Sequence, residues 1–193
     1  MEKDKFFMAI RKLTMAPLIA MIFLICMFIH RFDVFSGIGQ WAYCMFFIGV
    51  FPVLAYPMQR YFKAFRDKGR SGQRMLAIIF AVLGYIFCCI LNLFFASSPE
   101  LWIIVLEYFI SGLIIFLFNR IFRLKISGHA CGITGPVLLL IHFGLYIQAT
   151  VGACLIALVY IASLKTKRHS LWQLIGGSAV PAAVIACLIA ILD

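Results

Sequence analysis

The feature that most constrains this chain is a succession of long apolar runs separated by short polar segments. An α-helix needs about 20 mostly apolar residues to cross a bilayer core, and only helices or closed barrels satisfy their backbone polar groups there. Seven runs can be recognised, at about residues 15–29, 39–57, 75–96, 101–119, two within 129–163 that meet near 144–148, and 172–192. We therefore predict an all-α fold, a polytopic membrane helix bundle of about seven transmembrane helices that forms one integral-membrane domain over residues 1–193.

Composition excludes an ordinary soluble domain. Hydrophobic residues make up 65% of the chain and charged residues only 12%, whereas about 25% of a typical soluble domain is charged. The seven cysteines fall inside the apolar runs without metal-ligand spacing, which favours small packing residues over ligands. We assign no disulfide, no metal site and no cofactor.

The N-terminal residues 1–13 interleave cations with large apolar side chains, a pattern typical of an amphipathic lead-in at a membrane surface. A cleaved signal peptide is the competing interpretation. The apolar run that follows ends at His30-Arg31-Phe32-Asp33 rather than at a small-residue cleavage site, so we keep it as the first membrane span.

The cations predict a topology. Sixteen of the 17 Lys and Arg residues lie in the N-terminal lead-in or in the segments after the second, fourth and sixth runs, and only Arg31 lies on the other side. Cytoplasmic loops hold the excess of Lys and Arg, so we expect a multi-pass protein of a prokaryotic plasma membrane with these basic inserts on the cytoplasmic face. Cations recruited for a substrate would give the same pattern, so the shared face follows more directly than its cytoplasmic label.

Two of the basic inserts end in a histidine that opens an apolar run. The first contains Ser127-Gly128-His129 and the second runs from Ser163 to His169. The N-terminus of a helix attracts anions through its N–H groups, and the hairpin between the inserts returns the chain to the face that it left. A histidine at a span end is by itself most often an interfacial residue, but the pair, together with the nearby cations, predicts an anion-binding site.

These residues form three motifs along residues 58–180. Lys63 is followed after six residues by Arg70; Ser127-Gly128-His129 opens one run; and His169 opens the next but one. The set resembles the type 2 phosphatidic acid phosphatase superfamily, which includes lipid phosphate phosphatases and vanadium haloperoxidases. The resemblance implies a six-helix phosphatase-like core within the bundle.

The motifs depart from the family pattern at four positions. Ser71 and Ile126 stand where the family has proline, Ser163 where it has arginine, and Gln173 where it has aspartate. Arg74 competes with Arg70 for the same role in the first motif. Lys165, Lys167 or Arg168 could replace the arginine. Gln173 is one helical turn from His169 and could still accept its N–H, but without the negative charge of an aspartate.

The resemblance implies an integral-membrane lipid phosphate or diphosphate phosphatase that needs no metal. His169 would be the nucleophile, His129 the general acid and base, and Gln173 the residue that orients His169. The phosphoryl oxygens would be held by Lys63, Arg70, Arg74, Ser127, Gly128, Lys165 and Arg168. The expected partners are a lipid phosphate or isoprenoid phosphate substrate and membrane lipids, and no nucleic acid.

Two other functions stay open. Ser163 and Gln173 favour a catalytically weakened or inactive member that binds lipid phosphates as a scaffold or regulator. A small transporter would need polar residues spread through the spans, for which Glu107, His142 and Gln148 are the candidates. An ionisable side chain within a span usually faces the bundle interior, so Glu107 is either functional or a buried hydrogen-bonded acid.

Overall fold

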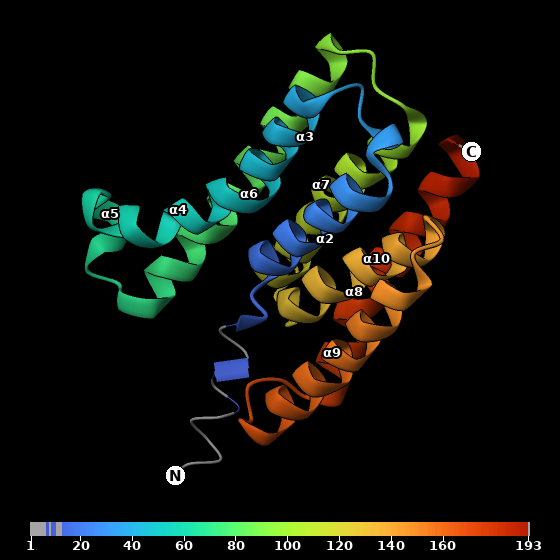
Figure 1. The fold of residues 1–193 in the computed structure, drawn as a ribbon. Coiled ribbons are helices and arrows are strands. Elements are labelled where there is room, and N and C mark those ends of the chain that lie inside the picture. Colours follow the sequence, from blue (N-terminus) through green and yellow to red (C-terminus); the bar gives the residue numbers. More distant parts are fainter. Residues whose placement is uncertain (1–6, 8, 11–12, 193) are drawn as a thin grey trace.

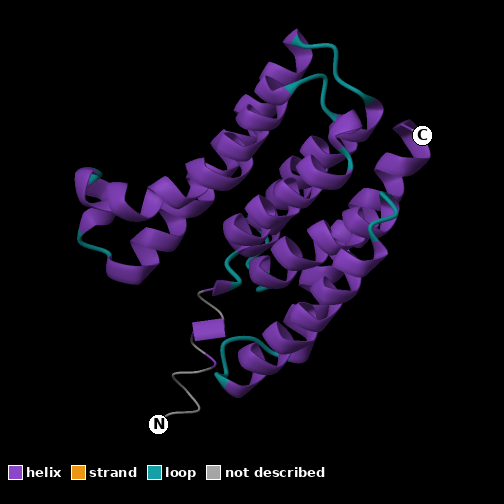
Figure 2. Cartoon of the chain, in the orientation of Figure 1, coloured by secondary structure: helices purple, strands orange, loops and turns teal. Residues whose placement is uncertain are grey.

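The computed structural model describes Phe7, residues 9–10 and residues 13–192, and in that part of the chain all regular structure is helical (Figure 2). The α-helices are α2 (Ala16–His30), α3 (Ile38–Cys44), α4 (Phe51–Met58), α5 (Lys63–Arg66), α6 (Gly69–Phe94), α7 (Pro99–Arg120), α8 (Gly128–His142), α9 (Tyr146–Lys165) and α10 (Leu171–Leu192). The predicted all-α membrane bundle is confirmed. The lead-in predicted over residues 1–13 lies almost wholly outside the described residues.

Each of the seven predicted runs corresponds to a helical segment. Within the part of the chain that the structure describes, five segments are long and apolar enough to cross a membrane: Ile38–Tyr61, Gly69–Phe94, Pro99–Arg120, Tyr146–Lys165 and Leu171–Leu192. The other two, α2 and α8, have 15 residues each, which rise about 22 Å. The two runs predicted within residues 129–163 meet near residue 144 as expected, but they form helices of unequal length, 15 residues in α8 and 20 in α9.

The second run is one continuous helical segment with a wider turn inside it. Residues Met45–Val50 are π-helical between α3 and α4, and the N–H of Phe51 bonds to the carbonyl of Phe46, five residues back. Pro52 follows immediately. Proline has no N–H and its ring clashes with the carbonyl four residues earlier, so a local widening relieves the helix at this position.

The polar segment between the second and third runs, residues 59–74, is mostly helical. A 3-10 turn (Gln59–Tyr61) and α5 lead directly into α6, which begins at Gly69, six residues before the predicted start. The side-chain amide of Gln59 donates to the carbonyls of Phe65 (2.9 Å) and Gly69 (2.8 Å). We call residues 59–69 the elbow; it projects sideways from the bundle at the left of Figure 1.

The bundle packs around α2, α7, α8 and α10, which share the largest core. Helices α4 and α6 pack together beside it, and α9 packs on α8. The elbow, the start of α8 and the turn between α9 and α10 lie toward the lower left end of the bundle as drawn in Figure 1, opposite the C-terminus. The predicted shared face of the basic inserts is therefore present, and we call it the basic end.

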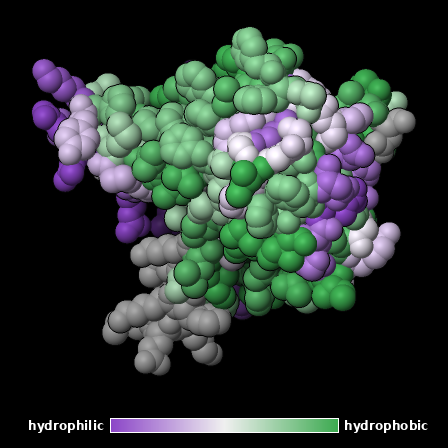
Figure 3. Space-filling model, turned by 45° about the horizontal axis from the view of Figure 1, so that its top comes forward, coloured by the Kyte–Doolittle hydropathy of each residue, from purple (hydrophilic) through white to green (hydrophobic). Residues whose placement is uncertain are grey.

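The outer surface has the character of a membrane protein. Hydrophobic side chains cover most of the face shown in Figure 3, and hydrophilic ones gather in patches toward its edges. Large apolar side chains such as Ile22, Phe87, Leu93, Ile147 and Leu158 are at least 40% exposed along the helices. Such a surface is stable when lipid covers it.

Candidate functional site

A cavity of about 640 Å³ opens at the basic end between α4 and α6 on one side and α7 and α8 on the other. The start of α2 and the turn between α9 and α10 also contribute to its wall. Its size lies in the range of small-molecule sites in proteins. The charged and imidazole side chains that line it near the basic end are Arg74, Arg120, Lys125, Lys167, Arg168, His129 and His169.

The start of α8 places His129 on the cavity wall. Ser127 is the N-cap: its hydroxyl accepts from the N–H of Ala130 at 3.2 Å, as expected for a serine in this position. Ser127 is fully buried and does not line the cavity. The phosphate-binding role that we predicted for this hydroxyl stays a prediction; in this structure its oxygen caps α8. Gly128 does line the cavity and brings the helix N-terminus to it.

The start of α10 holds His169 in a defined orientation. Ser170 and Gln173 form a capping box, in which Gln173 N–H donates to Ser170 Oγ (3.4 Å) and Ser170 N–H donates to Gln173 Oε1 (3.2 Å). The same Oε1 lies 3.1 Å from Nδ1 of His169. An amide oxygen only accepts, so Nδ1 carries the proton and Nε2 of a neutral His169 carries the lone pair.

Gln173 also connects the two helix starts. Its backbone carbonyl accepts from the N–H of Ser127 at 2.9 Å, so the cap of α8 is joined to the first turn of α10. The approach needs a glycine: a Cβ on Gly177 would lie only 2.2 Å from the carbonyl oxygen of Ser127. One residue therefore orients His169 with its side chain and positions the His129 helix with its backbone.

We expect Gly177→Ala to destabilise the protein, because the added methyl must push α8 away from α10. Overpacking of this kind costs about 1–3 kcal/mol, and phosphate-ligand binding should weaken with it. Thermal unfolding in detergent measures the effect. Gly39→Ala in α3 is the matched control, because a Cβ there meets nothing within 4 Å and alanine favours a helix. Equal unfolding temperatures for the two variants would contradict the prediction.

Thr14 fixes the tautomer of His129. The hydroxyl of Thr14 donates to the carbonyl of Ile10 at 2.8 Å and lies 3.1 Å from Nε2 of His129. With its proton committed to Ile10, the hydroxyl can only accept from the imidazole. A neutral His129 therefore carries its proton on Nε2. The two histidines have opposite tautomers, Nε2–H for His129 and Nδ1–H for His169.

The basic end of the cavity is strongly cationic. The described residues form ion pairs between Arg31 and Asp33 and between Arg66 and Asp67, and neither pair lines the cavity. Glu107, at the inner end, is the one acidic side chain in its wall among the described residues. A region with this charge, two imidazoles and a helix N-terminus suits a phosphate group.

Besides Ser127, three other predicted phosphate ligands are not in the cavity wall. Lys63 lies exposed on α5 and Arg70 in the first turn of α6, one turn farther out than Arg74. Lys165 is the exposed last residue of α9. Their phosphate-binding roles stay predictions without support from the cavity wall, whereas Arg74, Gly128 and Arg168 line the cavity with both histidines.

Three residues at the site were not predicted from the sequence. Arg120 and Lys125 were counted only among the cations that predict the topology, yet both line the cavity, and Thr14 contacts His129. No motif marks them, because they come from segments that only the folded bundle brings together. The Ser170-x-x-Gln173 spacing of a capping box, by contrast, is visible in the sequence and could have placed the start of α10.

The inner end of the cavity is polar. Glu107 is 2% exposed and packs against Gly135, where a Cβ would lie 2.5 Å from its Oε1. Glu107 Oε2 and the hydroxyls of Tyr108 and Ser111 have no hydrogen-bond partner among the described residues, and all three residues line the cavity. Unpaired buried polar groups are costly, so this end favours a water molecule or a polar ligand group over bare hydrocarbon.

Comparison with protein family models, with curated proteins and with solved structures finds no match for this chain.

Proposed function

We propose that the protein is an integral-membrane phosphatase that hydrolyses a lipid phosphate or diphosphate through a phosphohistidine on His169. The observation that carries the proposal is the pair of histidines with complementary tautomers in one cationic cavity. The joint role of Gln173 supports it, because the residue that orients His169 also anchors the helix of His129.

In the first step, Nε2 of His169 attacks phosphorus and the bond from phosphorus to the lipid oxygen breaks. Gln173 keeps the Nδ1 proton of His169 hydrogen-bonded while positive charge develops on the ring. His129 acts as an imidazolium and gives a proton to the departing lipid oxygen. We assign that proton to Nδ1, because Nε2–H donates to Thr14. Nearby cations offset the charge on the phosphoryl oxygens.

In the second step, water attacks the phosphohistidine. Neutral His129 now has its lone pair on Nδ1, since Thr14 keeps the proton on Nε2, and this lone pair accepts the water proton. The phosphorus–nitrogen bond breaks, phosphate leaves, and His169 returns to its starting tautomer. The products are inorganic phosphate and the lipid alcohol, or inorganic phosphate and the lipid monophosphate when the substrate is a diphosphate.

The cavity wall favours a lipid substrate over a water-soluble phosphate ester. Beyond the basic end, apolar side chains from both sides line the cavity, among them Pro52, Ile78, Val82, Ile115 and Phe116. A phosphate at the basic end would leave an attached chain among these side chains. The substrate class is thus a phosphorylated lipid, of glycerolipid or isoprenoid type, in phospholipid metabolism.

A second candidate function is binding without catalysis, as a scaffold or regulator. Gln173 favours it, because an amide lacks the charge that would stabilise an imidazolium. Ser163 is weaker evidence for this binding function than the sequence suggested. Ser163 is fully buried, while Lys167 and Arg168 line the cavity and supply cations there.

The transporter interpretation has less support. His142 is the last residue of α8, and Gln148 hydrogen-bonds to His30 at 3.0 Å. Neither lines the cavity, so among the three candidates only Glu107 does.

Phosphate release by the purified protein separates these functions. A panel of phosphatidic acid, a lysophospholipid phosphate and an isoprenoid phosphate and diphosphate is incubated with protein in detergent, and inorganic phosphate is measured. Release from at least one lipid, lost in His169→Ala, is the expected result. If the protein binds the lipids but releases no inorganic phosphate, the scaffold or regulator function is favoured over the phosphatase.

Gln173 variants test the orienting contact. Gln173→Ala removes the acceptor for His169 and should lower turnover by about tenfold or more, since orienting partners of an imidazole contribute on that scale. Gln173→Glu keeps an acceptor of the same length, maintains the capping box and adds charge, so turnover should be maintained or raised. Steady-state phosphate release measures both. A Glu variant as slow as the Ala variant would show that the contact only caps the helix.

We propose that the basic end faces the cytoplasm of a prokaryotic cell, since cations concentrate there. In intact cells, a membrane-impermeant maleimide should label Ser36→Cys, at the opposite end, and leave Arg66→Cys in the elbow unlabelled. Wild-type protein gives the background from its native cysteines. Labelling of residue 66 from outside would show that the cations serve the substrate rather than the topology.

A further inference from the structure

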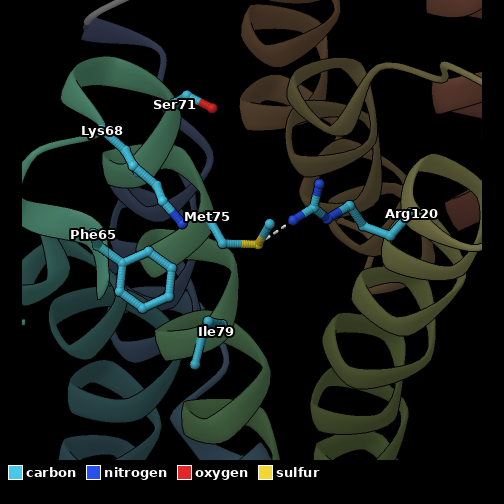
Figure 4. Close-up of a pocket in the computed structure, with 7 residues that line it drawn as sticks. Phe65, Lys68, Ser71, Met75, Ile79 and Arg120 are labelled. Atoms are coloured by element: carbon cyan, nitrogen blue, oxygen red, sulfur yellow. Dashed lines mark hydrogen bonds between the residues drawn. The ribbon is translucent and has the colours of Figure 1, made fainter. Parts of the chain in front are cut away.

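A second basic pocket lies outside the cavity, between the elbow side of α6 and the end of α7. Its volume is about 410 Å³, and it is lined by Phe65, Lys68, Ser71, Gly72, Met75, Ile79 and Arg120. Lys68 and Arg120 extend into it from opposite walls, with Met75 between them (Figure 4). We call it the outer pocket.

The two cations of the outer pocket have weak partners. Arg120 Nη2 donates to the thioether sulfur of Met75 at 3.1 Å, and a thioether is a poor acceptor for a guanidinium. The ammonium of Lys68 lies 5.8 Å from the centre of the Phe65 ring. No carboxylate pairs with either cation among the described residues. Two uncompensated cations beside the Ser71 hydroxyl form a site for an anion.

The rest of the pocket is apolar and descends into the bundle. Its apolar lining consists of Phe65, Met75 and Ile79. Ile79 lies eight residues beyond Ser71 on α6, which is about 12 Å along the helix axis. The pocket therefore has a charged end at the basic face and an apolar end toward the middle of the membrane. This polarity matches a phospholipid, whose headgroup lies above its chains.

The position of the elbow fits the same partner. Tyr61, Phe62 and Phe122 are exposed by 68%, 37% and 62%, and exposed aromatic side chains at a helix end are typical of the membrane–water interface. Gln59 holds the elbow closed through two backbone carbonyls. Lys68 is thus kept at headgroup level facing Arg120.

We infer that the outer pocket binds the headgroup of an anionic phospholipid from the surrounding bilayer, with an acyl chain along Met75 and Ile79. Basic pockets between membrane helices recognise such headgroups through charge. The inference does not depend on catalysis in the cavity. Arg120 lines both sites, whereas Lys68 lines only the outer pocket, so Lys68 isolates the outer pocket in an experiment.

Native mass spectrometry of the full chain, released from detergent with phosphatidylglycerol or phosphatidylcholine, tests the inference. Wild-type protein should retain phosphatidylglycerol in preference to phosphatidylcholine. Lys68→Gln should lower its affinity by about fivefold, and Lys68→Gln with Arg120→Gln by about 25-fold, the scale of one and two cations near a membrane surface.

The matched control is Arg60→Gln with Arg123→Gln, which removes two exposed cations of the basic end that do not line the outer pocket. It should bind phosphatidylglycerol as the wild type does. Equal losses in the two double variants, or no preference for the anionic lipid, would overturn the inference. So would displacement of the lipid by an equal concentration of glycerol 3-phosphate, since the pocket would then be a simple anion site.

Discussion

His169→Ala should reduce lipid phosphate hydrolysis by at least about 10³-fold, which is a conservative figure for loss of a covalent nucleophile. The cationic cavity and the helix N-terminus of α8 remain in this variant, so it should still bind a lipid phosphate. Turnover should fall while affinity stays close to that of the wild type. Phosphate release and equilibrium binding of a lipid phosphate measure the two quantities.

His142→Ala is the control, because it removes an imidazole from α8 at the end opposite the cavity and should leave turnover unchanged. A covalent role also predicts a trapped intermediate. Wild-type protein quenched during turnover of a radiolabelled lipid phosphate should carry label that survives base and is lost in acid, as expected for phosphohistidine, and His169→Ala should carry none. Turnover that persists in His169→Ala would rule out the proposed mechanism.

The helices were predictable from the sequence because the bilayer sets their lengths and their apolar character. The start of a helix was predictable where the sequence contains a recognisable N-cap residue. Ser98 caps α7 with Pro99 in its first turn, and Ser127 caps α8, so both starts fall within two residues of the prediction. The start of α6 was not predicted, because its first six residues, Gly69–Arg74, are glycines or polar residues and precede the apolar run.

The histidines were predictable as a pair because a hairpin must return to the face that it leaves. The cations were less predictable. Lys63 and Arg70 have the spacing of a motif, but the chain turns between them, from α5 into α6. Their separation in the sequence therefore does not predict that their side chains lie on the same face. Thr14 was not predictable at all, since its contact with His129 joins residues 115 positions apart.

Removal of the His129 imidazole should produce the second large loss of turnover. His129→Gln keeps a polar side chain of similar reach at the start of α8 but removes the group that exchanges protons with substrate. Loss of a general acid lowers turnover by about 10²–10⁴-fold, and we expect a loss in this range for an alkyl lipid phosphate, whose departing oxygen is strongly basic.

The nature of the leaving group distinguishes this role from a structural one. A nitrophenyl phosphate departs as a stable anion and needs no proton, so His129→Gln should slow formation of the phosphohistidine from it much less than from an alkyl phosphate. Single-turnover burst kinetics isolate that step. Thr14→Val removes only the acceptor for His129 Nε2 and should show the same dependence on the leaving group, at smaller amplitude. Equal losses for both leaving groups would assign His129 to phosphate binding rather than to proton transfer, because a residue that holds the phosphoryl group acts on both substrates alike.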